Sequence, residues 1–501
     1  MNLADRIRGV VGRSTGGSAE PTSASAEPAL RTTEVPHPPY VRRPGSAVPP
    51  VGSAYPAEIR LGGERREWHG HPYVVIDRTY PPGYRHGDVA VADSVPGQGG
   101  AWPVLSVLEP ALARAGRVLF VDLETTGLAG GAGTYAFLIG CGWFEDATFR
   151  VRQFLLAAYP AERGLLQELA GAAGGAGAVA TYNGKTFDLP LIEMRCLFHR
   201  MATPFAGMPH VDMLHSARRL WGARRPGSAV RTVGPADPAA SADPASCRLS
   251  WIEQSVLGHV REGDVPGFEI PSRYFHYVRS GDARPLAGVI EHNRLDLLSL
   301  AMLTARAAQL LEQGADAART AREALGLGGL YLRRGMQPQA RACFVRAAEM
   351  EHGGDMLTRA EALRAYAVVC RRSRDYEEAA QAWRRILDLS PSVPHLMQEA
   401  HDALAVHHEH RLRDFRVAHE FALQSLVFSV TASRVEAARH RVARLHRKLG
   451  LFPLVTGEPD KARATGLGRI PLPGTDRGPY FGGDTPLWRR HPEGWRHVWL
   501  N

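Results

Sequence analysis

Apolar residues in the middle of the chain follow a strand-like pattern. Between residues 117 and 157 the runs RVLFVDLE, YAFLIGCGWF and TFRVRQFLL are separated by Gly- or Asp-containing turns, which predicts three strands in a meander. Helical periodicity follows in PAERGLLQELAGAA, then a strand over GAVATYN and a helix from Phe187 to about His199. A short strand at PHVDML and several helices complete the region. We therefore predict an α/β domain over residues 116–310, with a mixed five-stranded sheet and flanking helices.

Beyond residue 310 helical periodicity continues without strand-like runs. The tripeptides EAL, EAL and DAL at 323–325, 361–363 and 402–404 each open an apolar-periodic helix. Each is followed by a second helix with an aromatic residue, at positions spaced 39 and then 38 residues apart: Phe344, Trp383 and Phe421. Helix pairs at such a period stack because one pair alone cannot bury its apolar face. We predict an all-α helical-repeat domain, similar to tetratricopeptide repeats, over residues 311–455.

The remaining segments are less regular. Residues 1–54 are rich in Ser, Ala, Pro and Gly, and residues 226–246 have a similar composition. We expect the first to be a disordered tail and the second a loop insertion, because neither can bury enough apolar surface to offset its ordering entropy. Residues 55–115 predict a small accessory element, partly strand, that ends in a helix over SVLEPALARAG. The Gly- and Pro-rich residues 456–501 predict an irregular C-terminal tail.

Composition limits the class of protein. The chain of 501 residues has 44% hydrophobic and 22% charged residues, a net charge of +9 and a pI of about 9.5. That balance is compatible with a polyanionic partner. The five cysteines form no CxxC pair, and no apolar run is long enough to span a membrane. We expect a cytoplasmic protein with neither disulfides nor a membrane partner.

Three separated segments hold acidic residues in positions typical of a metal site. Asp122 and Glu124 are two apart on an apolar strand, so both side chains project from one face of the sheet. Asp188 lies in the first turn of a helix, and His292 and Asp296 are four apart on one helical face. Carboxylates supply the oxygen ligands that hard divalent cations prefer, and a nearby imidazole suits a general base.

Other residues near these motifs are candidates for substrate contact. Thr125 and Thr126 open a tight turn where backbone would approach a nucleotide, Asn183 would bind substrate or orient a ligand, and Lys185 would reach a phosphate. Each also has an ordinary explanation as a turn or surface residue. Asp212 in HVDML is expected to be a structural cap, and HHEH at 407–410 a solvated helix face.

The motifs carry a resemblance to a known family. VDLETTGL resembles the first exonuclease motif of the DEDD superfamily of ribonuclease H-like exonucleases, YNGKTFDLP is similar to the second, and HNRLD stands where the third is expected. With the helical tail, the chain resembles bacterial ribonuclease H-like proteins fused to tetratricopeptide-like repeats. The resemblance implies that Asp122, Glu124, Asp188 and Asp296 are the metal ligands and His292 the base. His292 precedes Asp296 by four positions, the spacing usual for a tyrosine base, whereas histidine bases usually precede by five.

These observations together predict a metal-dependent nuclease. The residues themselves favour phosphodiester hydrolysis with two Mg²⁺ or Mn²⁺ ions, and the resemblance implies 3′→5′ exonuclease polarity. The expected substrate is DNA or RNA that is single-stranded or has a free 3′ end, and a protein partner is expected on the helical repeats. Two alternatives remain: a structure-specific endonuclease on the same fold, and a scaffold whose repeats bind a protein while its nuclease site is vestigial.

Overall fold

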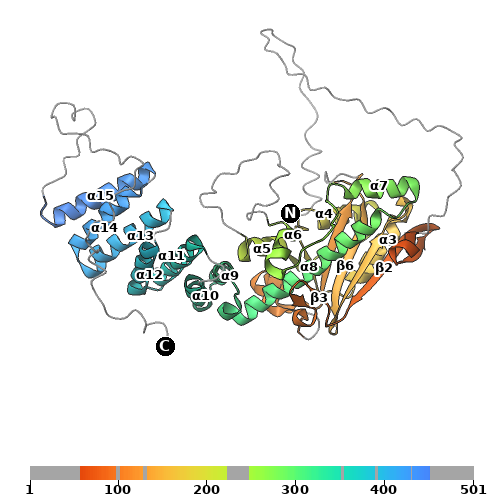
Figure 1. Cartoon of the computed structure of the whole chain (residues 1–501), viewed down its shortest axis with the longest axis horizontal. Helices are drawn as coiled ribbons and strands as arrows, with labels where there is room; N and C mark the ends of the chain where they lie inside the picture. The colour runs from red at the N-terminus through yellow and green to blue at the C-terminus, as the bar shows by residue number, and fades with distance from the viewer. Residues whose placement is uncertain are drawn as a thin grey trace, which may run out of the picture. The chain divides into compact units, whose positions relative to one another are not determined.

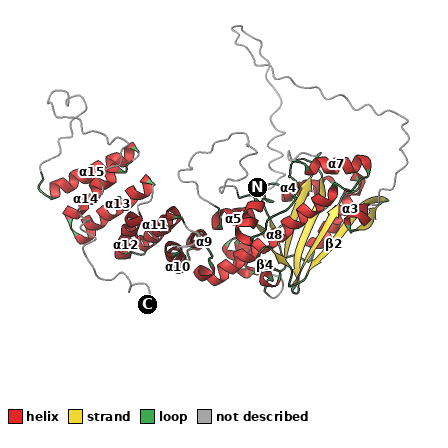
Figure 2. Ribbon diagram, viewed as in Figure 1, coloured by secondary structure: helices red, strands yellow, loops and turns green. Residues whose placement is uncertain are grey.

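The computed structural model describes residues 57–97, 102–127, 133–222, 247–350, 355–389, 393–429 and 431–451. The predicted tails over 1–54 and 456–501 and the predicted insertion over 226–246 lie outside these ranges. Within the described residues, strands are confined to the first part of the chain and helices make up the rest, as Figure 2 shows in yellow and red. None of the described helices combines the length and the apolar character needed to cross a membrane.

A mixed sheet of seven strands forms the centre of the first part, in the order β1-β2-β7-β6-β5-β8-β9. Its strands are β1 (Glu64–Trp68), β2 (His71–Tyr80), β5 (Val118–Thr125), β6 (Ala136–Glu145), β7 (Thr148–Leu155), β8 (Ala178–Thr181) and β9 (His210–Asp212). The β5/β8 and β8/β9 pairs are parallel and the other pairs are antiparallel. The predicted mixed sheet is confirmed, with β5 to β9 as the five strands within residues 116–310, and β1 and β2 of the accessory element extend it beyond β7 to seven strands.

The accessory element also contains helix α2 (Ala57–Leu61), the short pair β3 (Arg85–His86) and β4 (Val89–Ala90), and the 3₁₀ helix η1 (Ala92–Ser94). The helix predicted over SVLEPALARAG is wrong. Two 3₁₀ helices stand there instead, η3 (Pro103–Val107) and η4 (Pro110–Arg114). Pro110 has no N–H to donate, and its ring clashes with the carbonyl four residues earlier, so a single α-helix cannot run through this position.

Strand β5 is central in the sheet because its residues Val118–Val121 are apolar and fully buried. Its side chains alternate between the two faces. Leu119 and Val121 pack with Leu165 and Leu169 of helix α3 (Glu162–Ala173). The opposite face carries Asp122 and Glu124, and the long helix α8 (Leu286–Gln313) lies against it over β5 and β6 (Figure 1).

The other helices of this part are short. They are η5 (Tyr159–Ala161), α4 (Asp188–Phe198), α5 (Met213–Leu220), α6 (Leu249–Ile252), the π-helix η7 (Glu253–Leu257) and α7 (Ile270–Ser280). The helix predicted from Phe187 to about His199 is confirmed by α4, with its first turn at Asp188. Helix α8 continues to Gln313, beyond the boundary predicted at residue 310.

All regular elements described in the second part are helices, as predicted. After η8 (Gly314–Ala317) come α9 (Ala321–Arg333), α10 (Gln337–Glu349), α11 (Met356–Arg372), α12 (Tyr376–Leu389), α13 (Pro394–His407), η9 (His408–Leu412), α14 (Phe415–Val427) and α15 (Ala432–Lys448). From α9 to α15, each helix packs against the next in the chain. The repeated aromatics Phe344, Trp383 and Phe421 are buried on α10, α12 and α14.

The solvated face predicted for HHEH at 407–410 is wrong. His407 and Glu409 are buried, where α13 gives way to the π-helix η9. The Glu409 carboxylate accepts hydrogen bonds from Arg444 (2.9 and 2.7 Å) and Lys448 (2.8 Å) of α15. The tract therefore links two helices through a paired acid.

Candidate metal and catalytic site

Asp122 and Glu124 lie near the end of β5, where the pairing with β6 shifts register between Glu124 and Thr125. Both side chains are half-buried on the face that α8 covers. Asp122 stands opposite Gly140 of β6. A Cβ atom at Gly140 would overlap the side-chain oxygen of Asn293 from α8. Gly140 therefore allows α8 to approach the sheet at the position of the acid.

Asn293 fixes the orientation of Asp122. Its Nδ2 donates to Asp122 Oδ2 at 2.8 Å and to the Asp122 carbonyl at 3.2 Å. Its Oδ1 accepts a hydrogen bond from Gln153 Nε2 at 2.8 Å, which settles which end of the amide faces the acid. Asn293 and Gln153 are both fully buried. The carboxylate is thus held by a chain of buried hydrogen bonds that spans β7, α8 and β5.

Asp188 joins the cluster from the start of α4. A Cβ at Gly184 would lie 2.7 Å from Asp188 Oδ2, so the glycine in YNGKTFD is required by this close approach. Burial first, and then the carboxylates of Asp212 and Asp296, raise the pKa of Asp188 to about 7. Burial and the charges of Asp296 and Asp188 likewise raise the pKa of Asp122 and of Glu124. Acids from β5, α4 and α8 therefore share one site.

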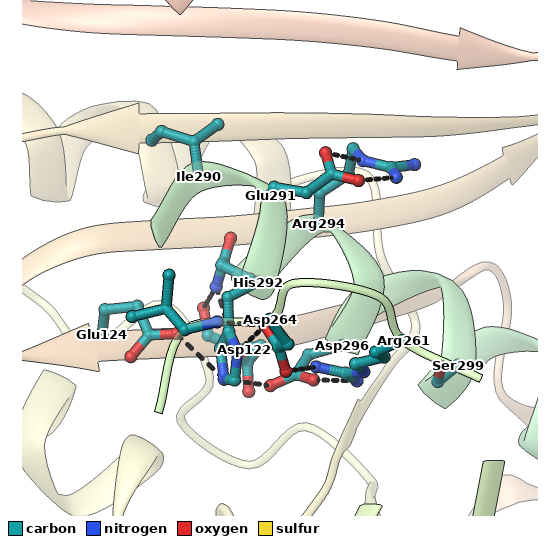
Figure 3. A network of polar contacts seen from close by, with 12 residues as sticks. Asp122, Glu124, Arg261, Asp264, Ile290, Glu291, His292, Arg294, Asp296 and Ser299 are labelled. Carbon is teal, nitrogen blue, oxygen red and sulfur yellow. Dashed lines mark hydrogen bonds and ion pairs between the residues drawn. The ribbon is translucent and has the colours of Figure 1, made fainter. Parts of the chain in front are cut away.

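Helix α8 contributes His292 and Asp296 on one face, as their spacing predicts. His292 Nε2 lies 3.6 Å from Asp296 Oδ2 and 4.0 Å from Glu124 Oε1. Glu124, His292 and Asp296 each offer one ligand atom, and these atoms lie within 4.8 Å of one another. The two carboxylates are hard oxygen donors and the imidazole offers a nitrogen, a set that suits a divalent cation. Figure 3 shows His292 between Glu124 and Asp296.

Two further residues that contact the site, which the sequence did not reveal, come from the loop between η7 and α7. Asp264 Oδ1 lies 2.7 Å from His292 Nδ1, and the Arg261 guanidinium contacts both Asp264 and Asp296 (Figure 3). Arg261 also pairs with Glu253 of η7 (2.6 and 2.8 Å). Charged residues in the Gly- and Pro-containing stretch VREGDVPG were the only signal, and nothing in their spacing points to α8.

The four predicted substrate-contact residues lie beside the acids, in turns. Thr125 Oγ1 donates to the Gly127 carbonyl at 3.1 Å, and Thr126 Oγ1 accepts from Tyr135 N at 3.0 Å. Asn183 has a φ of 67°, and its N–H donates to Asp212. Lys185 Nζ lies 3.9 Å from Glu109 Oε2. Their hydrogen bonds are those of turn and surface residues, and a role in substrate binding stays a prediction.

Asp212 has the capping role expected from the sequence. It is the N-cap of α5, where Oδ1 accepts from Leu214 N at 3.0 Å. The same carboxylate accepts from the backbone N–H groups of Asn183 (2.8 Å) and Lys185 (3.1 Å). By holding the turn before α4 on the end of β9, Asp212 sets the position of Asp188.

Comparison with known proteins agrees with this arrangement. A family model described as RNase_H superfamily matches residues 119–308, the range that holds all nine predicted site residues. The Bacillus subtilis (strain 168) protein named "Uncharacterized protein YprB" is 30% identical over 335 residues, which cover 66% of this chain and 75% of that protein. The mixed sheet with flanking helices is accordingly a ribonuclease H-like α/β fold. The chain belongs to the same family as YprB, within the ribonuclease H superfamily.

Proposed function

We propose that this protein is a divalent-metal-dependent nuclease with 3′→5′ exonuclease activity on DNA or RNA. The observation that carries the proposal is the meeting of Asp122, Glu124, Asp188 and Asp296 with His292 from three separated segments. Membership of the ribonuclease H superfamily points to a nuclease-type phosphodiesterase. The polarity rests on the resemblance of the motifs to DEDD exonucleases.

Two Mg²⁺ or Mn²⁺ ions would be held by the carboxylates of Asp122, Glu124, Asp188 and Asp296. The fit follows from the donor set: all four acids are oxygen ligands, and burial together with neighbouring carboxylates raises the pKa of Asp122, Glu124 and Asp188. Bound ions would supply charge stabilisation to the attacking and leaving oxygens of the phosphodiester. They would also offset the repulsion among the acids.

The chain's own residues would do the remaining work. His292 Nε2 faces the acids and would accept a proton from the attacking water, since an imidazole changes protonation near neutral pH. Asn293 would keep Asp122 in one orientation. Thr125, Thr126, Asn183 and Lys185 would lie along the nucleic acid backbone, and the net charge of +9 would favour a polyanion.

The test is degradation of end-labelled single-stranded DNA and RNA with Mn²⁺, comparing wild type with Asp122→Ala and Asp188→Ala. We expect laddering from the 3′ end in the wild type. The degradation rate should fall by at least about 100-fold in each variant, as it does when an electrostatic contact to the transition state is removed. Asp282→Ala is the matched control, because Asp282 pairs only with exposed Arg284 and His276 in the described structure. Variants that match the wild type would disprove the nuclease.

A circular single-stranded substrate separates the two kinds of nuclease. An exonuclease leaves the circle intact and degrades it after a single nick. Cleavage of the closed circle at the rate of the linear strand would establish the endonuclease alternative instead. Blocking the 3′ end with a phosphorothioate linkage should stop degradation, whereas blocking the 5′ end should not.

We also propose that the helical part binds a protein segment with acidic side chains next to a large apolar one. A pocket of about 490 Å³ lies among α11, α12, α13 and α15. Its lining combines the apolar side chains of Tyr376, Trp383 and Val406 with the cations of Arg371 and Arg411. Two acids, Glu399 and Asp402, also line it, and each is paired with an arginine of its own. The Arg411 guanidinium lies 3.6 Å from the centroid of the Tyr376 ring and has no carboxylate partner among the described residues.

A labelled peptide of alternating Glu and Trp residues is a suitable probe for this pocket. The Arg371→Glu/Arg411→Glu double variant should bind it at least tenfold more weakly than the wild type in fluorescence anisotropy. The Arg416→Glu/Arg439→Glu double variant, at exposed positions of α14 and α15, is the charge-matched control and should bind as the wild type does. Equal binding by all three proteins would rule out this pocket.

A further inference from the structure

The loop between η7 and α7 places a carboxylate in contact with His292 and a guanidinium in contact with that carboxylate. The loop carries Arg261 and Asp264, and α8 carries His292 and Asp296. Arg261 contacts three carboxylates, those of Glu253, Asp264 and Asp296. Only 6% of its side chain is exposed. A guanidinium so enclosed does not reach out to a substrate, so its partners must be sought within the site.

Glu253 of η7 holds Arg261 in place. Both Glu253 oxygens accept from Arg261, and the Glu253 side chain is fully buried. Ser299 of α8 donates to Glu253 Oε2, and His86 Nε2 lies 2.7 Å from the same hydroxyl. The bidentate pair with Glu253 therefore fixes the orientation of the Arg261 guanidinium, whose remaining N–H groups face Asp264 and Asp296.

Asp264 connects this frame to His292. Its Oδ2 lies 3.2 Å from Arg261 Nη1, and its Oδ1 lies 2.7 Å from His292 Nδ1. A carboxylate that accepts from Nδ1–H holds an imidazole in one tautomer, with the lone pair on Nε2. In this orientation Nε2 faces Glu124 and Asp296 at 4.0 and 3.6 Å.

We propose that Arg261 and Asp264 are positioning residues for the nuclease reaction. Asp264 fixes the tautomer and ring orientation of His292, and Arg261 fixes Asp264 and Asp296 relative to each other. Neither residue touches the substrate. The assignment of His292 as the base rests on the proposed function, whereas the tautomer of its ring does not, and this difference allows the two ideas to be tested separately.

The first experiment reads the tautomer directly, without metal or nucleic acid. Long-range ¹H–¹⁵N spectra of the full-length protein at a pH where imidazoles are neutral report which ring nitrogen carries hydrogen. His292→Gln identifies the signal among the 21 histidines of the chain. We expect the Nδ1–H form in the wild type and a shift towards the Nε2–H form in Asp264→Ala. An unchanged tautomer in that variant would overturn the proposal.

The second experiment separates positioning from mere loop stability. Asp264→Ala and Arg261→Met should lower kcat by about 10- to 100-fold, as loss of an orienting partner does, with KM for the nucleic acid within about twofold. Asp264→Glu should recover part of kcat. Arg273→Met is the matched control, because Arg273 pairs with Glu269 at the start of α7, away from His292. A rise in KM with kcat unchanged would contradict positioning.

Outcomes for the two ideas are distinguishable. If the His292 tautomer depends on Asp264 but the protein degrades no nucleic acid, the positioning role stands and the nuclease function is disproved. If the protein is an active nuclease but neither the His292 tautomer nor kcat changes in Asp264→Ala, the nuclease function stands and the positioning role is disproved. Should Asp264→Ala fail to fold, Asp264→Asn preserves the shape of the side chain, and its neutral amide should still weaken the hold on Nδ1–H and lower kcat.

Discussion

Asn293 of α8 and Asp122 of β5 are joined by a hydrogen bond of 2.8 Å at a point where the sheet has a glycine on the adjacent strand. The bond exists because Gly140 leaves room for the asparagine. The contact between a helix and a sheet is thus used to orient a candidate metal ligand. The close packing of α8 on the sheet and the orientation of Asp122 therefore both depend on the missing side chain of Gly140.

Gly140→Ala should therefore impair both stability and activity. The added methyl group would meet Asn293 and Leu297, and overpacking of this kind costs about 1–3 kcal/mol. Urea denaturation measures the cost, and nuclease rates should fall as α8 moves off Asp122. Gly171→Ala, at a position of α3 with open space around it, should instead be neutral or slightly stabilising. Equal behaviour of the two variants would contradict this account.

Asp188→Asn should separate stability from metal binding. Because burial and neighbouring acids raise the pKa of Asp188 to about 7, the charged form is disfavoured in the metal-free fold, and the neutral amide should raise the melting temperature without metal. Added Mn²⁺ should stabilise the wild type by about 2.7 kcal/mol at 100 times its Kd. The variant should gain much less, and thermal denaturation with and without Mn²⁺ checks both effects.

His401 should make the protein sensitive to acid. Burial lowers the pKa of His401 to about 4, and its ring stacks on Phe428. Because the folded-state pKa is depressed, the unfolded chain takes up a proton first, and stability present above pH 6.5 is lost as the pH falls towards 4. His401→Leu should reduce the loss between pH 7 and pH 4.5 by on the order of 2 kcal/mol. An identical pH profile of unfolding would show that His401 is not responsible.

Glu323→Ala should be strongly destabilising. The buried carboxylate of Glu323 on α9 accepts from Trp221 Nε1 (2.9 Å) and from Arg306 Nη2 of α8 (2.7 Å). Its removal leaves the buried charge of Arg306 without its acid, which costs about 3–5 kcal/mol. Chemical denaturation provides the measurement. Glu436→Ala, which removes an exposed pair with His440, should change stability by less than about 1 kcal/mol.

The acids of the site were predictable because local geometry places them. Asp122 and Glu124 share a face by strand alternation, and His292 and Asp296 by helical spacing. Arg261 and Asp264 were not predictable, since the path of an irregular loop depends on tertiary packing. The same reason explains why the sequence did not predict that β1 and β2 extend the sheet. β2 pairs with β7, which lies far along the chain, and such a pairing leaves no local signal. At residues 103–114, proline geometry overrode the helical pattern.

Helix α8 carries His292 and Asp296 near its start and Arg306, the partner of Glu323, near its end. The boundary predicted at residue 310 falls inside this one helix. A protein cut there would end in mid-helix and lose the α9 acid that neutralises Arg306, and Leu310 and Leu311, now buried, would lie at a new chain end. Helix α8 therefore belongs to both the ribonuclease H-like part and the helical part, and a cut at residue 310 would divide an element that both parts use.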